Sequence, residues 1–210
     1  MKPKLIVFAS GTKDGGGSGF ENLVNATKTG ELDAEIVGVV SNNENGGVRE
    51  RATRLGVPFI YFPGPYNAEH YQKVVSDAGA EWVALSGWFK LVQGLDPRKT
   101  VNIHPMLFSS GDRFRGKGMY GRHIHEAVKA ALDAGEITGS GFTMHFVTDE
   151  MDGGPVILEH PIPLSKDMSV DEIEDAVKKS EFEWQPKILN KIVHGEISWD
   201  GKDPASLKII

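Results

Sequence analysis

Two polar side chains that can act together in catalysis, Asn102 and His104, stand at the end of a short apolar segment, VNIHPML. On a β-strand alternate side chains point to opposite faces, so the two are predicted to share one face while their apolar neighbours share the other. Pro105 lacks a backbone N–H group and ends the strand. At about 3.3 Å per residue, the two residues lie about 6 to 7 Å apart along the backbone, which lets both side chains reach one substrate atom.

Three carboxylates lie beside a glycine pair and a proline in a second segment, TDEMDGGP, at residues 148–155. Asp and Gly are also common in ordinary turns, so the composition alone does not make this loop a site. Carboxylates next to an imidazole favour its charged form. An amide N–H and an imidazolium N–H together can hold an oxyanion while a carboxylate stabilises the imidazolium. No Gly-x-Ser-x-Gly nucleophile motif is present, so the attacking group is expected to belong to the substrate.

A glycine-rich segment, SGTKDGGGSGFENL, follows the first apolar run. Glycines let successive backbone N–H groups face one anion at the start of a helix, which predicts a phosphate site rather than a merely flexible turn. The segment lacks the lysine of a P-loop and the spacing of a dinucleotide-binding motif, so a phosphate monoester is favoured. The residues assigned to the phosphate are Gly15, Gly16, Gly17, Ser18, Gly19 and Asn22.

Short apolar runs alternate with amphipathic stretches through the first half of the chain. The runs at 4–10, 35–41, 57–62 and 82–87 are separated by predicted helices, and the TVNIH segment follows them. This order predicts a doubly wound α/β fold with a mostly parallel sheet that is buried on both faces. Helix ends are expected at Gly30, Gly56 and Gly79, since glycine readily adopts the left-handed conformation that closes a helix.

Longer strands are predicted in the second half. Residues 139–148 alternate, with Phe142, Met144 and Phe146 on one face, and residues 155–164 follow after a glycine pair. Ser169 and Glu172 form a capping box that begins a helix. Pro186 is expected to break or kink that helix.

The composition is that of an ordinary globular protein, with 210 residues, 40% hydrophobic and 25% charged. One domain over 1–210 is expected, with a phosphate-binding half at about 1–100 and a second half at about 101–198 that carries the candidate catalytic residues. The absence of cysteine excludes disulfides and thiol catalysis. No apolar run is long enough for a membrane span and no signal peptide is recognised, so a cytoplasmic protein is expected.

The expected partners are small molecules. A net charge of −6 argues against broad binding to nucleic acid or to an anionic membrane. No metal site is expected, because His123 and His125 are two positions apart on a helix and diverge. Either a monomer or a homodimer is compatible with the sequence.

The motifs NIHP at 102–105 and GFTMHFVTDEMDGGPVILEHPIPL at 141–164 resemble those of the glycinamide ribonucleotide transformylases, folate-dependent formyltransferases of purine synthesis. The resemblance extends from VFASG near the start to SEFEWQP in the last helix. It implies transfer of a formyl group from the co-substrate 10-formyltetrahydrofolate to the amine of glycinamide ribonucleotide. It also implies that Asn102, His104 and Asp152 are catalytic, and that the aspartate keeps the histidine protonated.

The same resemblance assigns binding residues. Glu181 is implied to contact the amine end of the substrate. The physical argument for a folate slot is that aromatic residues after a buried strand can border a flat ring, although Trp88 and Phe89 can equally fill core. The implied folate-binding residues are Phe89, Lys90, Leu91, Val92, Thr148, Asp149, Glu150 and Met151.

Two departures from the family pattern stand out. The loop 106–122 is long and basic, and it carries Arg113, Arg115, Lys117 and Arg122 as candidate contacts for a phosphate or for the glutamate tail of folate. A solvated basic loop is the alternative. The arginine that binds the folate carboxylate in the family falls at Ala68, so that contact is lost or supplied from elsewhere.

Three other functions stay open at this point. One is formyl transfer to a different amine, such as an amino sugar nucleotide. Another is hydrolysis of the formylfolate. The third, of a different class, is a non-catalytic sensor of a phosphate ligand that keeps the fold.

Overall fold

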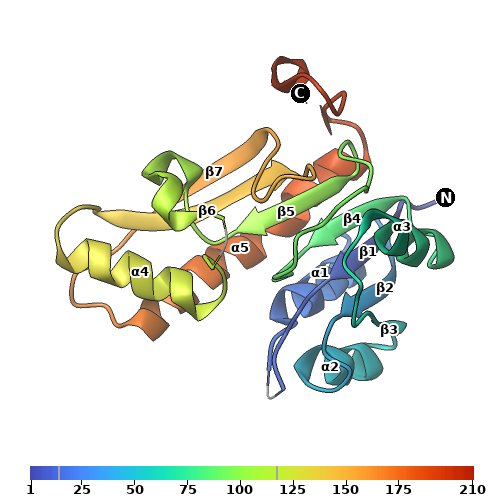
Figure 1. The fold of residues 1–210 in the computed structure, drawn as a ribbon, viewed down its shortest axis with the longest axis horizontal. Coiled ribbons are helices and arrows are strands. Elements are labelled where there is room, and N and C mark those ends of the chain that lie inside the picture. Colours follow the sequence, from blue (N-terminus) through green and yellow to red (C-terminus); the bar gives the residue numbers. More distant parts are fainter. Residues whose placement is uncertain (14, 117) are drawn as a thin grey trace.

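The computed structural model describes residues 1–13, 15–116 and 118–210, and Asp14 and Lys117 lie outside the described residues. Within this part of the chain a seven-stranded sheet has the strand order β3-β2-β1-β4-β5-β6-β7, flanked by helices (Figure 1). The five strands from the first half pair in parallel. The prediction of a doubly wound, mostly parallel α/β fold is therefore confirmed.

The first half alternates strands and helices, as the sequence pattern predicts. Parallel neighbours need a crossover, and each crossover between β1 and β4 is a helix. The elements are β1 (Lys4–Phe8), α1 (Ser18–Thr29), β2 (Glu35–Ser41), α2 (Gly47–Leu55), β3 (Phe59–Tyr61), α3 (Ala68–Asp77), β4 (Trp82–Leu85) and β5 (Thr100–His104).

The second half adds two antiparallel strands to the edge of the sheet, with β6 paired to β5 and β7 paired to β6. The alternation predicted for 139–148 is confirmed, because Phe142, Met144 and Phe146 all point into one core cluster. The remaining elements are η1 (Phe108–Ser110), η2 (Asp112–Phe114), α4 (Arg122–Asp133), β6 (Gly139–Phe146), β7 (Val156–Pro163), α5 (Val170–Val193), β8 (Ile197–Ser198), η3 (Pro204–Ser206) and β9 (Lys208–Ile209).

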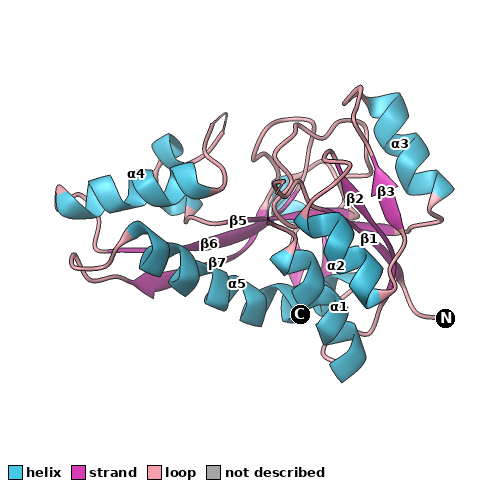
Figure 2. Cartoon of the chain, turned by 90° about the horizontal axis from the view of Figure 1, so that it is seen from below, coloured by secondary structure: helices cyan, strands magenta, loops and turns pink. Residues whose placement is uncertain are grey.

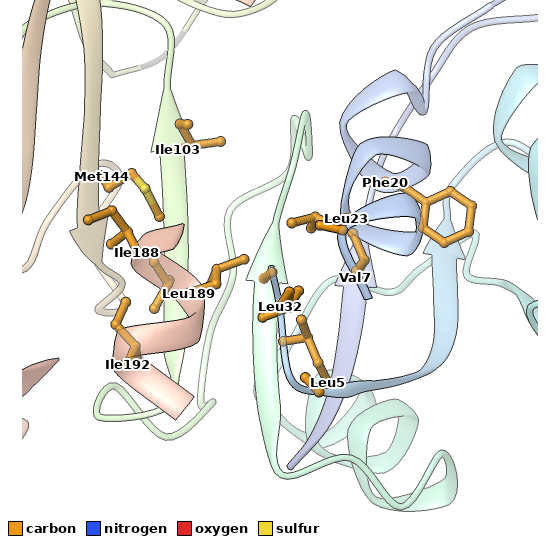
Figure 3. Packing of buried hydrophobic residues seen from close by; sticks show 14 of the residues in the cluster. Leu5, Val7, Phe20, Leu23, Leu32, Ile103, Met144, Ile188, Leu189 and Ile192 are labelled. Atoms are coloured by element: carbon orange, nitrogen blue, oxygen red, sulfur yellow. The ribbon is translucent and has the colours of Figure 1, made fainter. Parts of the chain in front are cut away.

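Helices cover both faces of the sheet. Figure 2 shows α1, α2 and α5 on one side, with α3 and α4 on the other. Alternate residues of β1 divide accordingly, since Leu5 packs in the cluster with α1 and α5 whereas Ile6 packs with α3. Figure 3 shows Ile188 and Leu189 of α5 in the same cluster as Ile103 of β5. The central strands are apolar throughout because both faces are buried.

The direction of strand order reverses at β1, which lies between β2 and β4. In open α/β sheets ligands bind beyond the carboxyl ends of the strands at such a switch point. Here the loops that follow β1 and β4 are joined, because the Ser10 amide donates to the Gly87 carbonyl at 2.8 Å and the Phe89 amide donates to Ser10 Oγ at 2.9 Å. The sheet therefore brings the glycine-rich loop and the GWFKL loop to one edge.

The predicted helix boundaries are largely correct. Gly30 and Gly56 cap α1 and α2 in the left-handed conformation, with φ of 82° and 70°. Helix α3 is instead capped by Ala78, and Gly79, with φ of 63°, follows it. The capping box of Ser169 and Glu172 is present at the start of α5.

The predicted break at Pro186 is wrong, because α5 continues from Val170 to Val193 through the proline. A proline inside a helix leaves the carbonyl four residues earlier without its backbone donor. That carbonyl belongs to Phe182, and it accepts a hydrogen bond of 2.8 Å from the Asn22 side chain of α1. Tertiary contact with α1 thus satisfies the group that the proline leaves free.

None of the helices in the described part of the chain is both long and apolar enough to cross a membrane.

Candidate active site

Asn102 and His145 form a hydrogen-bonded pair across β5 and β6. The two residues are register partners, and Asn102 Nδ2 lies 3.1 Å from His145 Nε2. His145 Nδ1 lies 2.7 Å from the Phe146 carbonyl and 3.1 Å from the Gly153 carbonyl, both of which can only accept, so this nitrogen carries the proton. Nε2 is then an acceptor for Asn102. One N–H of the Asn102 amide is thereby fixed, and its second N–H can donate to a substrate oxygen.

His145 is a site residue that the sequence reasoning missed. Its side chain is 1% exposed, and burial lowers its pKa so that the ring stays neutral at physiological pH. Strand alternation placed it on the face opposite Phe142, Met144 and Phe146, but that pattern alone does not identify its partner. Its register with Asn102 across the antiparallel pair would have been the signal.

Both ring nitrogens of His104 face an oxygen atom of the protein. Its Nε2 lies 2.8 Å from the Phe114 carbonyl, and its Nδ1 lies 3.8 Å from Asp152 Oδ1. The carbonyl accepts, so Nε2 carries a proton in either charge state, and Nδ1 is the nitrogen that gains or loses one. The predicted convergence of His104 and Asp152 is therefore present in the structure.

The expected charge state of His104 is corrected by the structure. The side chain is only 5% exposed, and this burial lowers the pKa of His104 more than Asp152 and the Phe114 carbonyl raise it. Arg115 lowers the pKa of His104 further. Loss of hydration disfavours the imidazolium, so the ligand-free protein favours neutral His104.

Asp152 has an unusual backbone, with a φ of 51° in the left-handed region. Asp adopts this conformation more readily than most residues, but it still costs free energy. The strain is offset by two hydrogen bonds from the following loop. The Gly116 amide donates to Asp152 Oδ2 at 2.6 Å, and Arg115 Nη2 donates to the Asp152 carbonyl at 2.8 Å.

The glycine-rich loop forms a tight turn ahead of α1. Gly16 and Gly17 have φ values of 85° and 80°, and Gly17 is the N-cap of the helix. Arg51 holds the turn, because its Nη1 donates to the Gly16 carbonyl at 2.8 Å. Gly17 has no side chain to cap the first turn of α1, so the N–H groups near Ser18 stay a candidate anion site.

Two of the residues assigned to the phosphate have packing roles. A Cβ on Gly19 would lie 2.1 Å from Ser86 Oγ, so glycine is required there by the close approach of α1 to the loop after β4. The Asn22 side chain is turned away to Phe182, where it replaces the donor that Pro186 lacks. The assignment of Asn22 to the phosphate is therefore corrected.

The two predicted folate-binding segments meet at Gly94. Its amide donates to Asp149 Oδ1 at 2.7 Å, which joins the loop after β4 to the loop after β6. Phe89 stacks on Tyr120 with ring centroids 4.9 Å apart, while Lys90 Nζ lies 5.4 Å from the Tyr66 ring centroid. Phe89 is therefore not core filler, unlike Trp88, which is 8% exposed.

The other residues of these segments fall into two groups. Val92 is buried, and the Leu91 carbonyl accepts a hydrogen bond from the Tyr71 hydroxyl. Thr148 and Glu150 lie on the surface side of the loop, and Met151 is 45% exposed. At position 94 glycine is required, because a Cβ there would lie 2.3 Å from Ala68 Cβ.

Glu181 lies on the continuous helix α5, one turn before Gln185, whose Oε1 accepts from Ser86 Oγ at 3.3 Å. Burial raises the pKa of Glu181 to about 8, against a smaller lowering effect from Lys178.

Two cations of the basic loop are paired with acids. Arg113 pairs with Glu136, and Arg122 pairs with Asp171. Arg115 is directed toward Asp152, as described above, and Lys117 lies outside the described residues. Contact of this loop with a phosphate or with the glutamate tail of folate stays a prediction.

His123 and His125 lie on different sides of α4. His123 is exposed beside Glu126, whereas His125 is 5% exposed and its Nδ1 has no hydrogen-bond partner. Within the described residues, no group of three or more His, Cys, Asp or Glu side chains could hold a metal ion.

The chain is similar to known formyltransferases in sequence and in fold. The family model described as formyl transferase matches residues 3–189. The chloroplastic phosphoribosylglycinamide formyltransferase of Arabidopsis thaliana is 30% identical over 210 residues, which cover 94% of this chain and 68% of that protein.

Two solved structures share the architecture. Glycinamide ribonucleotide transformylase 1 from Geobacillus kaustophilus is 28% identical, with a TM-score of 0.74, and the match covers 92% of this chain and 100% of that one. The same enzyme from Symbiobacterium toebii, at 23% identity, matches in fold with a TM-score of 0.82 over 100% of this chain and 94% of that one. The resemblance seen in the NIHP and HFVTDEMDGGP motifs is thereby confirmed, and the chain belongs to the formyl transferase family.

Proposed function

We propose that the protein transfers a formyl group from 10-formyltetrahydrofolate to the amine of glycinamide ribonucleotide, a step of de novo purine synthesis. The observation that supports this proposal is at the end of β5, where His104 lies beside Asp152 and Asn102, two residues earlier on the strand, pairs with His145. The names of the Arabidopsis and Geobacillus relatives support the same reaction.

The geometry suits attack by a substrate amine on the formyl carbon. As the C–N bond forms, the carbonyl oxygen becomes an oxyanion, and the second N–H of Asn102 is available to hold it. His104 starts neutral and accepts the proton that the attacking amine loses, at Nδ1. Asp152 then stabilises the imidazolium, which can return the proton to N10 of the folate as the C–N10 bond breaks.

The two substrates are assigned to different loops. The first-turn N–H groups of α1 and the loop of Gly15, Gly16 and Gly17 bind the phosphate. Glu181, with its raised pKa, faces the amine end, where a cationic ammonium would restore the carboxylate. The pterin lies between the GWFKL loop and the 148–152 loop, which Gly94 and Asp149 tie together.

We assign only small-molecule partners, no metal, and either a monomeric or a homodimeric state. A cytoplasmic location is proposed from the sequence, although the Arabidopsis relative is named as chloroplastic.

The test is an acceptor comparison with the purified protein and 10-formyltetrahydrofolate. The absorbance change on loss of the formyl group is measured with glycinamide ribonucleotide, with an amino sugar nucleotide, and with no acceptor. Turnover only with glycinamide ribonucleotide is expected. Turnover only with the sugar nucleotide, or equal turnover without acceptor, would assign one of the other chemistries.

His104→Ala separates an enzyme from a phosphate-ligand sensor. We expect loss of turnover by about 100-fold or more, since a positioned acid–base group contributes at least that much. Binding of glycinamide ribonucleotide by calorimetry should be retained. A variant with unchanged turnover would exclude the proposed role of His104.

A further inference from the structure

Residues Gly111–Gly116, the cap loop, cover the catalytic pair. Three consecutive residues of this loop make the contacts: the Phe114 carbonyl to His104, the Arg115 guanidinium to the Asp152 carbonyl, and the Gly116 amide to the Asp152 carboxylate. These contacts leave His104 and Asp152 with side chains only 6% and 10% exposed. The loop that the sequence analysis considered an anion site thus lies against the reacting groups.

Of these three loop residues, Arg115 contacts the largest number of groups. Its guanidinium carbon lies 4.1 Å from the centroid of Phe108, a geometry that favours cation–π attraction. The Phe108 ring packs near both His104 and His145, with centroid distances of 5.3 and 5.0 Å. The Arg115 side chain therefore contacts the ring that packs near both histidines and also the backbone of Asp152.

The backbone of Asp152 explains why such a contact matters. Its left-handed φ of 51° is unfavourable for a residue with a side chain, so neighbouring contacts must maintain it. If the Asp152 carbonyl were released, the backbone could relax and carry Oδ1 away from its position 3.8 Å from His104 Nδ1. A charge-assisted hydrogen bond to a backbone carbonyl opposes that relaxation.

We infer that Arg115 is a positioning residue for formyl transfer, which holds Asp152 beside His104 without itself contacting the substrates. The inference rests on the proposed function for the reaction involved. It differs from an anion-binding role, because the guanidinium is already occupied by the Asp152 carbonyl, the Phe108 face and, at 3.8 Å, Asp112.

The pKa of His104 provides a measurement that would not change if Arg115 only stabilised the fold. Asp152 raises the pKa of His104, whereas Arg115 lowers it, and His104 in turn acts on the two other buried histidines, His125 and His145. If Arg115 holds Asp152 beside His104, loss of this contact should lower the pKa of His104, because Asp152 raises that pKa more than Arg115 lowers it. A lysine at this position should keep the charge but lose the planar donor pair.

The experiment compares Arg115→Gln and Arg115→Lys with a matched control, Arg49→Gln. Arg49 also lies over an aromatic ring, Phe59, and donates to a backbone carbonyl, but in α2. For both Arg115 variants we expect kcat to fall roughly 10- to 100-fold with little change in KM for either substrate, because a small displacement of a reacting group has effects of that size. Arg49→Gln should leave both constants unchanged.

Histidine NMR titration of His104 is measured on the same proteins. Arg115→Lys should lower the midpoint, because Asp152 moves away while the cation stays, and Arg115→Gln should lower it less, because the cation that lowers the pKa of His104 is lost as well. If the wild type does not use glycinamide ribonucleotide, the proposed function fails, while the titration still tests the link between Arg115 and His104.

Three results would overturn the inference. One is unchanged kcat in both Arg115 variants. Another is a raised KM with unchanged kcat, which would make Arg115 a substrate contact. The third is a fall in kcat that parallels a lower thermal midpoint while the His104 titration stays unchanged, which would assign Arg115 to stability alone.

Discussion

The hydrogen bond from Asn22 to Phe182 predicts a coupling between two positions that lie 164 residues apart in the sequence, 22 and 186. Pro186 removes the backbone donor for the Phe182 carbonyl, and the Asn22 side chain supplies another at 2.8 Å. Asn22→Ala leaves a partly buried acceptor without a partner, which costs about 1 to 3 kcal/mol of unfolding free energy. The same change in a Pro186→Ala background should cost less than about 1 kcal/mol, because the restored N–H can bond to Phe182.

The measurement is a double-mutant cycle in urea, followed by circular dichroism. The expected coupling is about 1 to 2 kcal/mol, well above the additivity error of roughly 0.5 kcal/mol for independent sites. Asn25→Ala is the control, since Asn25 is an exposed asparagine on the same helix, and it should change stability by less than about 0.5 kcal/mol in either background. Equal costs of Asn22→Ala in both backgrounds would refute the account of how α5 continues through the proline.

Three further predictions concern the site. Gly19→Ala should destabilise the protein by about 1 to 3 kcal/mol, because the added methyl group overpacks against Ser86 Oγ. In thermal melts, adding Ser86→Ala should recover much of this loss. If the destabilisations of the two substitutions simply add, the close approach of Gly19 to Ser86 is contradicted. His145→Phe should lower kcat roughly 10- to 100-fold, because it releases the Asn102 side chain. The control His160→Phe, on β7, should leave kcat unchanged. Equal kcat values for the two variants would show that His145 does not act in the site. Glu181, with its pKa raised from 4.5 to about 8, binds more protons folded than unfolded between those values, so its contribution to stability is lost as pH rises through that window. Between pH 5 and 8, the unfolding free energy should fall less in Glu181→Gln than in the wild type. Identical pH profiles for the two proteins would mean that the Glu181 side chain is solvated.

The pKa of His104 shows where sequence reasoning about a site fails. The acids of the 148–155 loop suggested an imidazolium, and Asp152 does raise the pKa of His104. The larger effect is burial beneath the cap loop, which depends on how residues 111–116 fold back over β5. Desolvation is set by every atom that excludes water, so no local pattern reveals it.

Local features of the chain were determined by the sequence itself. The left-handed glycines that end α1 and α2, the capping box of α5 and the alternation of β6 depend on residues within a few positions of one another. Asn102 and His104 share a face because of the strand period alone. Short-range sterics and hydrogen bonds decide such features, and these can be inferred from a window of sequence.

Tertiary structure alone decided which of these groups act on one another. The partner of Asn102 is His145, 43 residues away, and the carbonyl opposite Pro186 is satisfied by a helix from the other half of the chain. The arginines of the cap loop region were equivalent in sequence, but acidic neighbours engage Arg113 and Arg122, while only Arg115 among these three reaches Asp152. The physical reason is that hydrogen bonds, ion pairs and desolvation act through space, and the distances that govern them exist only after the sheet has assembled.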